Sequence, residues 1–97
     1  TQMIPKGKVA IISHDAGGSE ILSSFIKRYD IPYSLTVDGP AVKIFKRKLG
    51  KINNYPVQES IRKSNWVLTG TSWSSNLEYR AIRLANKEKV LMLYLIK

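Results

Sequence analysis

The sequence predicts a three-layer α/β domain of the Rossmann-like (flavodoxin-like) kind, with a parallel sheet of about five strands and helices on both faces. Short apolar segments alternate with amphipathic segments of helical length, the pattern that parallel sheets with crossover helices produce. The first apolar segment, Val9–Ser13, is uninterrupted from Val9 to Ile12, as expected of a strand covered on both faces. The length of 97 residues suits one domain, which we take to span residues 1–97.

A turn and a helix are expected after this strand. The turn covers His14–Ser19, and the helix continues to Tyr29, where Asp30 and Pro32 end it. The apolar stripe that would face the sheet consists of Ile21, Leu22, Phe25, Ile26 and Tyr29.

The second strand, Tyr33–Asp38, leads into a second helix. Gly39-Pro40 opens this helix, where a proline in the first turn loses no hydrogen bond, and Gly50 suits the cap at the other end. The side chains predicted to be buried on this helix are Val42, Phe45 and Leu49.

The next segment predicts less regular structure. A short third strand is expected at either Ile52 or Tyr55–Val57, followed by a brief helix at Gln58–Lys63. Trp66–Gly70 is the clearest later strand, with Trp66 in the core, and it runs into the hydroxyl-rich turn Thr71–Ser75.

A last helix and a last strand complete the pattern. Asn76 caps the helix, and Val90–Ile96 is an almost wholly apolar strand. Right-handed crossovers then favour an order in which the second and third strands lie on one side of the first strand and the later strands on the other. Because so apolar a final strand needs both faces covered, we expect either a missing second domain or a second subunit there. The buried side chains of the last helix are expected to be Leu77, Ala81, Leu84 and Ala85.

Composition excludes several classes of protein. The chain has no cysteine, which excludes disulfide scaffolds and thiolate metal sites. No stretch is long and apolar enough to span a membrane, so a cytoplasmic protein is the default expectation. The net charge of +9 favours anionic partners, nucleic acid among them. Much of the excess falls on one predicted helix and its end, where a solvated outer face is the simplest interpretation, at Lys43, Lys46, Arg47, Lys48 and Lys51.

The ligand site is expected where the strand order reverses. In such sheets ligands bind at the carboxyl ends of the strands, here between Val9–Ser13 and Trp66–Gly70. The loops that leave these strands, His14–Ser19 and Gly70–Ser75, would then frame one crevice. Gly17 and Gly18 lie in the first of these loops, and because they have no side chains a ligand can approach the backbone.

An anionic ligand is the predicted occupant. Gly17 and Gly18 bring backbone N–H groups at a helix start within reach of a phosphate. The alternative is a tight turn that binds nothing, with Ser19 as the helix cap. The side chains expected to add hydroxyl hydrogen bonds are Ser19, Thr71, Ser72 and Ser74.

Two residues are candidates for catalysis. His14, the only histidine, could act as a general base or bind phosphate, and Asp15 could orient a ligand hydroxyl. Adjacent residues rarely point the same way, so they are not interpreted as a dyad, and His14 could equally be an ordinary turn residue. Asp38 could bind a ribose hydroxyl or simply form a turn. Too few metal-ligating residues are present to predict a metal site.

Known phosphate-binding signatures are missing. Gly17-Gly18 lacks the third glycine of GxGxxG, and no GxxxxGK[ST] occurs, so a P-loop hydrolase is not expected.

Three segments together resemble the amino-terminal half of glycosyltransferase-B-type proteins, including UDP-N-acetylglucosamine 2-epimerase-like polysaccharide-biosynthesis proteins. They are Val9–Ser19, Asp38–Ala41 and Val67–Ser72, within a likeness that spans nearly the whole chain. The resemblance implies a Rossmann-like half whose loop Asp15–Ser19 lies at an interdomain cleft and binds a sugar nucleotide, such as a UDP-sugar, or a glycosyl acceptor. In that family the carboxyl-terminal half holds most nucleotide contacts, and this sequence does not contain it.

Three functions therefore stay open. The first is the sugar-binding domain of a glycosyltransferase-like or epimerase-like protein, a fragment of a two-domain chain. The second is a stand-alone small-molecule binding or regulatory module, dimeric through Val90–Ile96. The third is a basic nucleic-acid-binding domain, which ranks last because the basic residues lie away from the predicted crevice.

Overall fold

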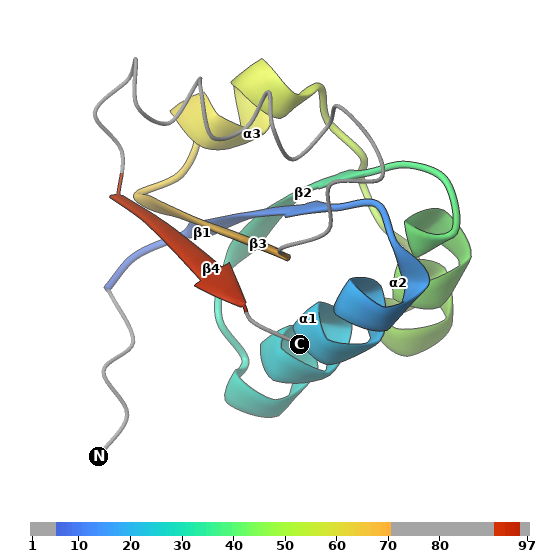
Figure 1. The fold of residues 1–97 in the computed structure, drawn as a ribbon. Helices are drawn as coiled ribbons and strands as arrows, with labels where there is room; N and C mark the ends of the chain where they lie inside the picture. The colour runs from blue at the N-terminus through green and yellow to red at the C-terminus, as the bar shows by residue number, and fades with distance from the viewer. Residues whose placement is uncertain (1–5, 71–90, 96–97) are drawn as a thin grey trace.

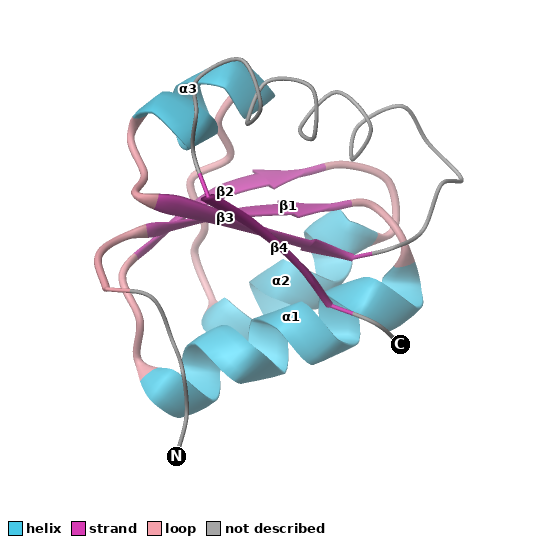
Figure 2. Cartoon of the chain, turned by 60° about the vertical axis from the view of Figure 1, so that its left-hand side comes forward, coloured by secondary structure: helices cyan, strands magenta, loops and turns pink. Residues whose placement is uncertain are grey.

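The computed structural model describes residues 6–70 and 91–95, which form a parallel sheet flanked by helices (Figure 1). In both views α1 and α2 lie together on one side of the sheet, and α3 lies on the other side (Figure 2). The elements are β1 (Val9–Ser13), α1 (Ala16–Tyr29), β2 (Tyr33–Val37), α2 (Ala41–Leu49), α3 (Val57–Arg62), β3 (Trp66–Gly70) and β4 (Leu91–Leu95).

The strand order is β2-β1-β3-β4, and every neighbouring pair is parallel. The first strand thus has β2 on one side and β3 on the other, which confirms the predicted neighbours of β1. Four strands are described out of the about five expected for such a sheet. The complete three-layer Rossmann-like arrangement stays a prediction, because the helix expected from Asn76 lies outside the described residues.

The predicted third strand is wrong in its extent. The described chain makes only an isolated parallel bridge there, between Leu35 and Asn54. The Asn54 side chain bonds both backbone groups of Val37, accepting from Val37 N at 3.0 Å and donating to Val37 O at 2.8 Å. A side-chain amide thus takes over pairing at this edge of β2. Pro56, two residues later, has no N–H with which to extend a ladder.

The core is centred on β1, all five residues of which are buried. A strand with neighbours on both sides and helices over the sheet meets no water, which explains its apolar run. Trp66 is also buried, as predicted. The buried apolar cluster consists of Val9, Ile11, Leu22, Ile26, Leu35, Val37, Ala41, Phe45, Trp66 and Leu68.

Helix α1 buries part of the predicted stripe, since Leu22 and Ile26 lie in the core and Phe25 packs against it. Ile21 is 41% exposed, whereas Ser19 and Ser23 are buried. Both hydroxyls have partners: Ser19 Oγ lies 2.7 Å from Ser13 Oγ, and Ser23 Oγ donates to Ser19 O at 2.6 Å. Small hydroxylated side chains can be buried against a strand when their hydrogen bonds are satisfied locally. Hydrophobicity alone therefore misassigned Ile21 and missed the two buried serines.

On α2 the buried side chains are Ala41, Ile44 and Phe45. Val42 and Leu49, predicted to be buried, are only partly buried and pack against the core cluster. The predicted C-terminal caps are confirmed, Asp30 in the left-handed conformation at α1 and Gly50 at α2.

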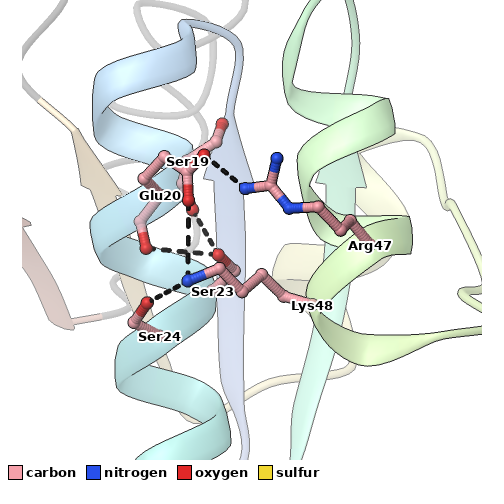
Figure 3. Close-up of polar contacts among 6 residues, drawn as sticks. All are labelled: Ser19, Glu20, Ser23, Ser24, Arg47 and Lys48. Atoms are coloured by element: carbon pink, nitrogen blue, oxygen red, sulfur yellow. Dashed lines mark hydrogen bonds and ion pairs between the residues drawn. The ribbon is translucent and has the colours of Figure 1, made fainter.

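Polar side chains join α1 and α2, and we call Glu20, Ser24, Arg47 and Lys48 the polar seam (Figure 3). The Glu20 carboxylate accepts a hydrogen bond from Arg47 and lies 3.5 Å from Lys48 Nζ. Lys48 Nζ also donates to Ser24 Oγ at 2.8 Å. Arg47 and Lys48 therefore contact α1, which corrects the prediction that they belong to a purely solvated face. The Arg47 hydrogen bond, with charge from both cations, holds the pKa of Glu20 below its ordinary value of 4.5.

This seam makes part of the stability sensitive to acid. Because the folded-state pKa of Glu20 is lowered, its contribution is present above about pH 4.5 and is lost as the pH falls through the folded value. We expect Glu20→Gln to lower the thermal midpoint near neutral pH, with the difference from the parent shrinking in acid and in high salt. Glu59→Gln is the control, since Glu59 pairs with Lys63, which caps the end of the same helix. A difference for Glu20→Gln that is independent of pH would contradict the ion-pair account.

A second buried polar cluster ties β2 to α3. Thr36 Oγ1 donates to Tyr55 O at 2.8 Å and lies 2.5 Å from Ser60 Oγ, and both side chains are buried. Thr69 Oγ1, by contrast, is buried without a hydrogen-bond partner among the described residues.

We therefore expect Thr36→Val to destabilise the fold by about 1–3 kcal/mol, because the Ser60 hydroxyl and Tyr55 O each lose a hydrogen bond. The same substitution at Thr69 should be neutral or stabilising, since it removes a hydroxyl that bonds nothing described. Chemical denaturation measures both. Equal losses for the two variants would show that volume and not hydrogen bonding sets the cost.

Within the described ranges, no helix has the length and apolar character needed to cross a membrane.

Candidate functional site

The candidate site lies where β1 and β2 end together. The two strands are in register, with Ser13 opposite Val37, so His14 and Asp38 leave the sheet side by side. Asp38 N donates to Ser13 O at 3.3 Å, and Ala41 N donates to His14 O at 3.1 Å. These backbone bonds tie the β1–α1 and β2–α2 turns into one unit at the carboxyl edge of the sheet.

His14 and Asp38 form a close pair within this unit. His14 Nδ1 lies 2.5 Å from Asp38 Oδ1, and the side chains are 25% and 53% exposed. Because an ionised Asp38 can only accept, this contact requires a proton on Nδ1, and the tautomer with that proton alone leaves Nε2 as an acceptor. No hydrogen bond to Nε2 exists within residues 6–70. The arrangement is that of a base held in one tautomer by a carboxylate.

Gly39 makes room for the imidazole. Its φ is +56°, a left-handed conformation that residues with a Cβ rarely adopt. A Cβ added at Gly39 would lie 2.7 Å from His14 Cε1, well inside van der Waals contact. Glycine is therefore required here for two reasons, the turn and the ring beside it.

The glycines after β1 have a different setting from the predicted one. Helix α1 begins at Ala16, so Gly17, Gly18 and Ser19 lie in its first turn and not in a loop; the predicted turn His14–Ser19 is wrong in this part. Asp15 is the N-cap and accepts from Gly18 N at 3.0 Å. A Cβ on Gly18 would lie 2.8 Å from Asp15 Oδ1, so this glycine lets the carboxylate fold over the helix end.

The cap changes the electrostatics of this helix end. A carboxylate at the N-terminus interacts favourably with the helix dipole and takes one of its unpaired N–H groups. A ligand phosphate at the same place would meet the negative charge of Asp15. Gly17 is exposed at this turn, whereas Gly18 and Ser19 are buried. Ser19, the predicted cap of the ligand-free alternative, instead bonds Ser13.

The other predicted ligand residues follow β3. Gly70 ends that strand and pairs with Leu95 of β4. Thr71, Ser72 and Ser74 lie outside the described residues, so their role as hydroxyl donors stays a prediction. The pairing of β3 with β1, Ile12 opposite Thr69, confirms that their carboxyl ends are neighbours.

In the described part of the chain, no group of three or more histidine, cysteine or carboxylate side chains could hold a metal ion.

The pairing of His14 with Asp38 escaped the sequence reasoning, which considered His14 with Asp15. In the structure each residue is the first after one of two consecutive strands of equal length, whereas the sequence prediction placed Asp38 inside the second strand and so gave no signal for the pairing. Adjacent parallel strands in register bring such residues together.

Comparisons with known proteins give no relative. No protein-family model, curated protein or solved structure matches this chain. The resemblance to glycosyltransferase-B-type proteins thus stays a hypothesis from the sequence motifs.

The contact between Gly39 and His14 predicts a coupling between the two positions. We expect Gly39→Ala to destabilise the fold by about 1–3 kcal/mol, through strain at positive φ and the clash with the ring. In a His14→Ala background the clash disappears, so the cost should fall by about 1 kcal/mol.

Gly50→Ala is the matched control for this double-mutant cycle. Its φ of +82° is also positive, yet a Cβ there meets nothing within 4 Å. Its cost should therefore be the same with and without His14. An equal cost of Gly39→Ala in both backgrounds would show that the imidazole does not lie against Gly39.

Proposed function

We propose that this chain is a Rossmann-like domain that binds the hydroxyl-rich part of a sugar nucleotide or glycosyl acceptor, as a domain of a glycosyltransferase-like or epimerase-like protein. The observation that carries it is the His14–Asp38 pair at the carboxyl edge of a parallel sheet. Ligands of open α/β sheets bind at that edge. The resemblance of the sequence to glycosyltransferase-B-type proteins supports the class of ligand.

The polar groups at this edge suit sugar hydroxyls better than phosphate. Asp38 and Asp15 carry carboxylates, and His14 Nε2 accepts; all three groups take hydrogen bonds from hydroxyls. A phosphate would be repelled by the Asp38 carboxylate. We therefore assign the sugar, and not the phosphates, to the neighbourhood of His14 and Asp38.

Nearby backbone and hydroxyl groups complete the proposed site. Exposed Gly17 lets the ligand approach the first turn of α1. Gly70 and the hydroxyls of Thr71, Ser72 and Ser74 follow β3, the neighbour of β1, and would bond the remainder of the ligand.

A reaction at this edge would use His14 as the base. Nε2 can take a proton from a sugar hydroxyl while the Asp38 carboxylate stabilises the imidazolium that forms. Asp15, the other catalytic candidate, would keep its capping role and bond a ligand hydroxyl at most. The same geometry serves pure binding, so a stand-alone binding or regulatory module is the alternative.

The net charge favours nucleic-acid binding, but the contacts of the basic residues in the structure weaken this interpretation. Arg47 and Lys48 contact the Glu20 carboxylate, so part of the positive charge on α2 is compensated within the fold.

Ligand binding tests this function directly. We expect UDP-N-acetylglucosamine or a free sugar acceptor to raise the thermal midpoint as its concentration increases. His14→Ala and Asp38→Asn should each weaken binding about tenfold or more by calorimetry, a loss of about 1.4 kcal/mol or more. Lys43→Gln changes an exposed residue of α2 and should leave the affinity unchanged. Equal binding by all variants, or no binding of any sugar ligand, would overturn the proposal.

A further inference from the structure

A second concave site lies at the opposite end of the strands, where β1 and β2 begin. A cavity of about 270 Å³ opens beside the amino-terminal end of β2. Its wall is mostly polar, and the polar side chains come from Lys8, Tyr33, Ser34, Lys51, Asn53 and Tyr55.

Three segments that are far apart in the sequence build this cavity. Lys8 directly precedes β1, and the register of Val9 with Tyr33 puts it beside the start of β2. Tyr55 N donates to Leu35 O at 2.9 Å, which holds the segment after α2 along the outer side of β2. The site is thus fixed by main-chain hydrogen bonds on both sides.

The charge of the cavity is positive. Lys8 and Lys51 line it, and no aspartate or glutamate of the described residues does. Within residues 6–70 neither lysine forms an ion pair, whereas Arg47, Lys48 and Lys63 each have a carboxylate within reach. Two ammonium groups in one small cavity repel each other unless an anion or water separates them.

Ser34 adds an independent observation. The residue is 1% exposed, and its hydroxyl is buried without a hydrogen-bond partner among the described residues. Most buried hydroxyls are bonded, so an unsatisfied one in the wall of a polar cavity points to a missing partner. An oxyanion is such a partner, because it accepts from hydroxyl, amide and ammonium groups alike.

We propose that this cavity binds a phosphate group, either free phosphate or the phosphate of a small monoester. Lys8 and Lys51 supply the charge, and Ser34 and Asn53 supply directed hydrogen bonds. The cavity lies at the amino ends of β1 and β2, and His14 and Asp38 lie at their carboxyl ends. Phosphate binding here therefore does not depend on the function proposed for the His14 edge.

Amide NMR titration of the intact chain with inorganic phosphate tests the proposal, with chloride at equal ionic strength as the reference. We expect saturable shifts at Ser34, Asn53 and Tyr55. Lys8→Gln and Lys51→Gln should each weaken binding about tenfold or more, since each removes a charge from the cavity.

Two further variants make the outcome decisive. Lys43→Gln removes the same charge from an exposed position of α2 that does not line the cavity, and it should change the affinity less than about twofold. Ser34→Ala should weaken binding while the fold persists. Equal effects of all three lysine substitutions, or no shifts at the cavity residues, would overturn the assignment.

A parallel titration with glucose 1-phosphate separates the two sources of phosphate. Tighter binding of the ester assigns the site to sugar phosphates, and equal affinities assign it to the phosphate group alone. Either result supports phosphate recognition, whereas failure of both probes contradicts it. Sugar binding at His14 would be unaffected by that failure.

Discussion

Every feature of the carboxyl edge depends on the register in which β1 pairs with its two parallel neighbours. Ser13 lies opposite Val37, and Ile12 lies opposite Thr69. Because parallel strands in register end at the same level, the chain segments that follow them are brought together. A shift of one residue would exchange the β1 side chains that face the two sides of the sheet and would move His14 out of line with Asp38. The same pairing that buries β1 thus sets the geometry of the candidate site.

At this end of the sheet, the Asp15 side chain caps the first turn of α1. Asp15 bonds Gly18 N, and the glycine is needed because a Cβ would strike the carboxylate. This local solution alters the chemistry available to a ligand, since a capped helix end is a poor phosphate site. Among the described residues, the two ends of the sheet differ in charge. Carboxylates gather at the carboxyl edge, and Lys8 and Lys51 lie at the amino edge.

Much of the fold could be predicted from the sequence because the core strands are continuously apolar. Val9–Ser13 and Trp66–Gly70 were predicted with the bounds that the structure has, and the position of β1 between β2 and β3 followed from chain topology. The errors arose where local hydrogen bonds outweigh hydrophobicity. Ser23 is buried because it bonds Ser19 O, and Asn54 replaces a strand residue with its side chain.

The site was harder to predict than the fold. The sequence indicated His14 and Asp38 separately, but their pairing depends on register, which no local pattern reveals. The glycine pair suggested an open phosphate loop, because nothing in the sequence shows that Asp15 folds back over the helix end. The cavity at Lys8 was not predicted, since its three segments meet only through β2 and the bridge at Asn54.

The tautomer of His14 tests the central claim most directly. Long-range ¹H–¹⁵N correlation of the imidazole reports which nitrogen carries the proton of the neutral ring. Pairing of Nδ1 with Asp38 requires the proton on Nδ1, and Asp38→Ala should shift the population toward the Nε2–H form. A neutral ring protonated on Nε2 in the parent protein, unchanged by Asp38→Ala, would show that the two strand ends do not meet as described.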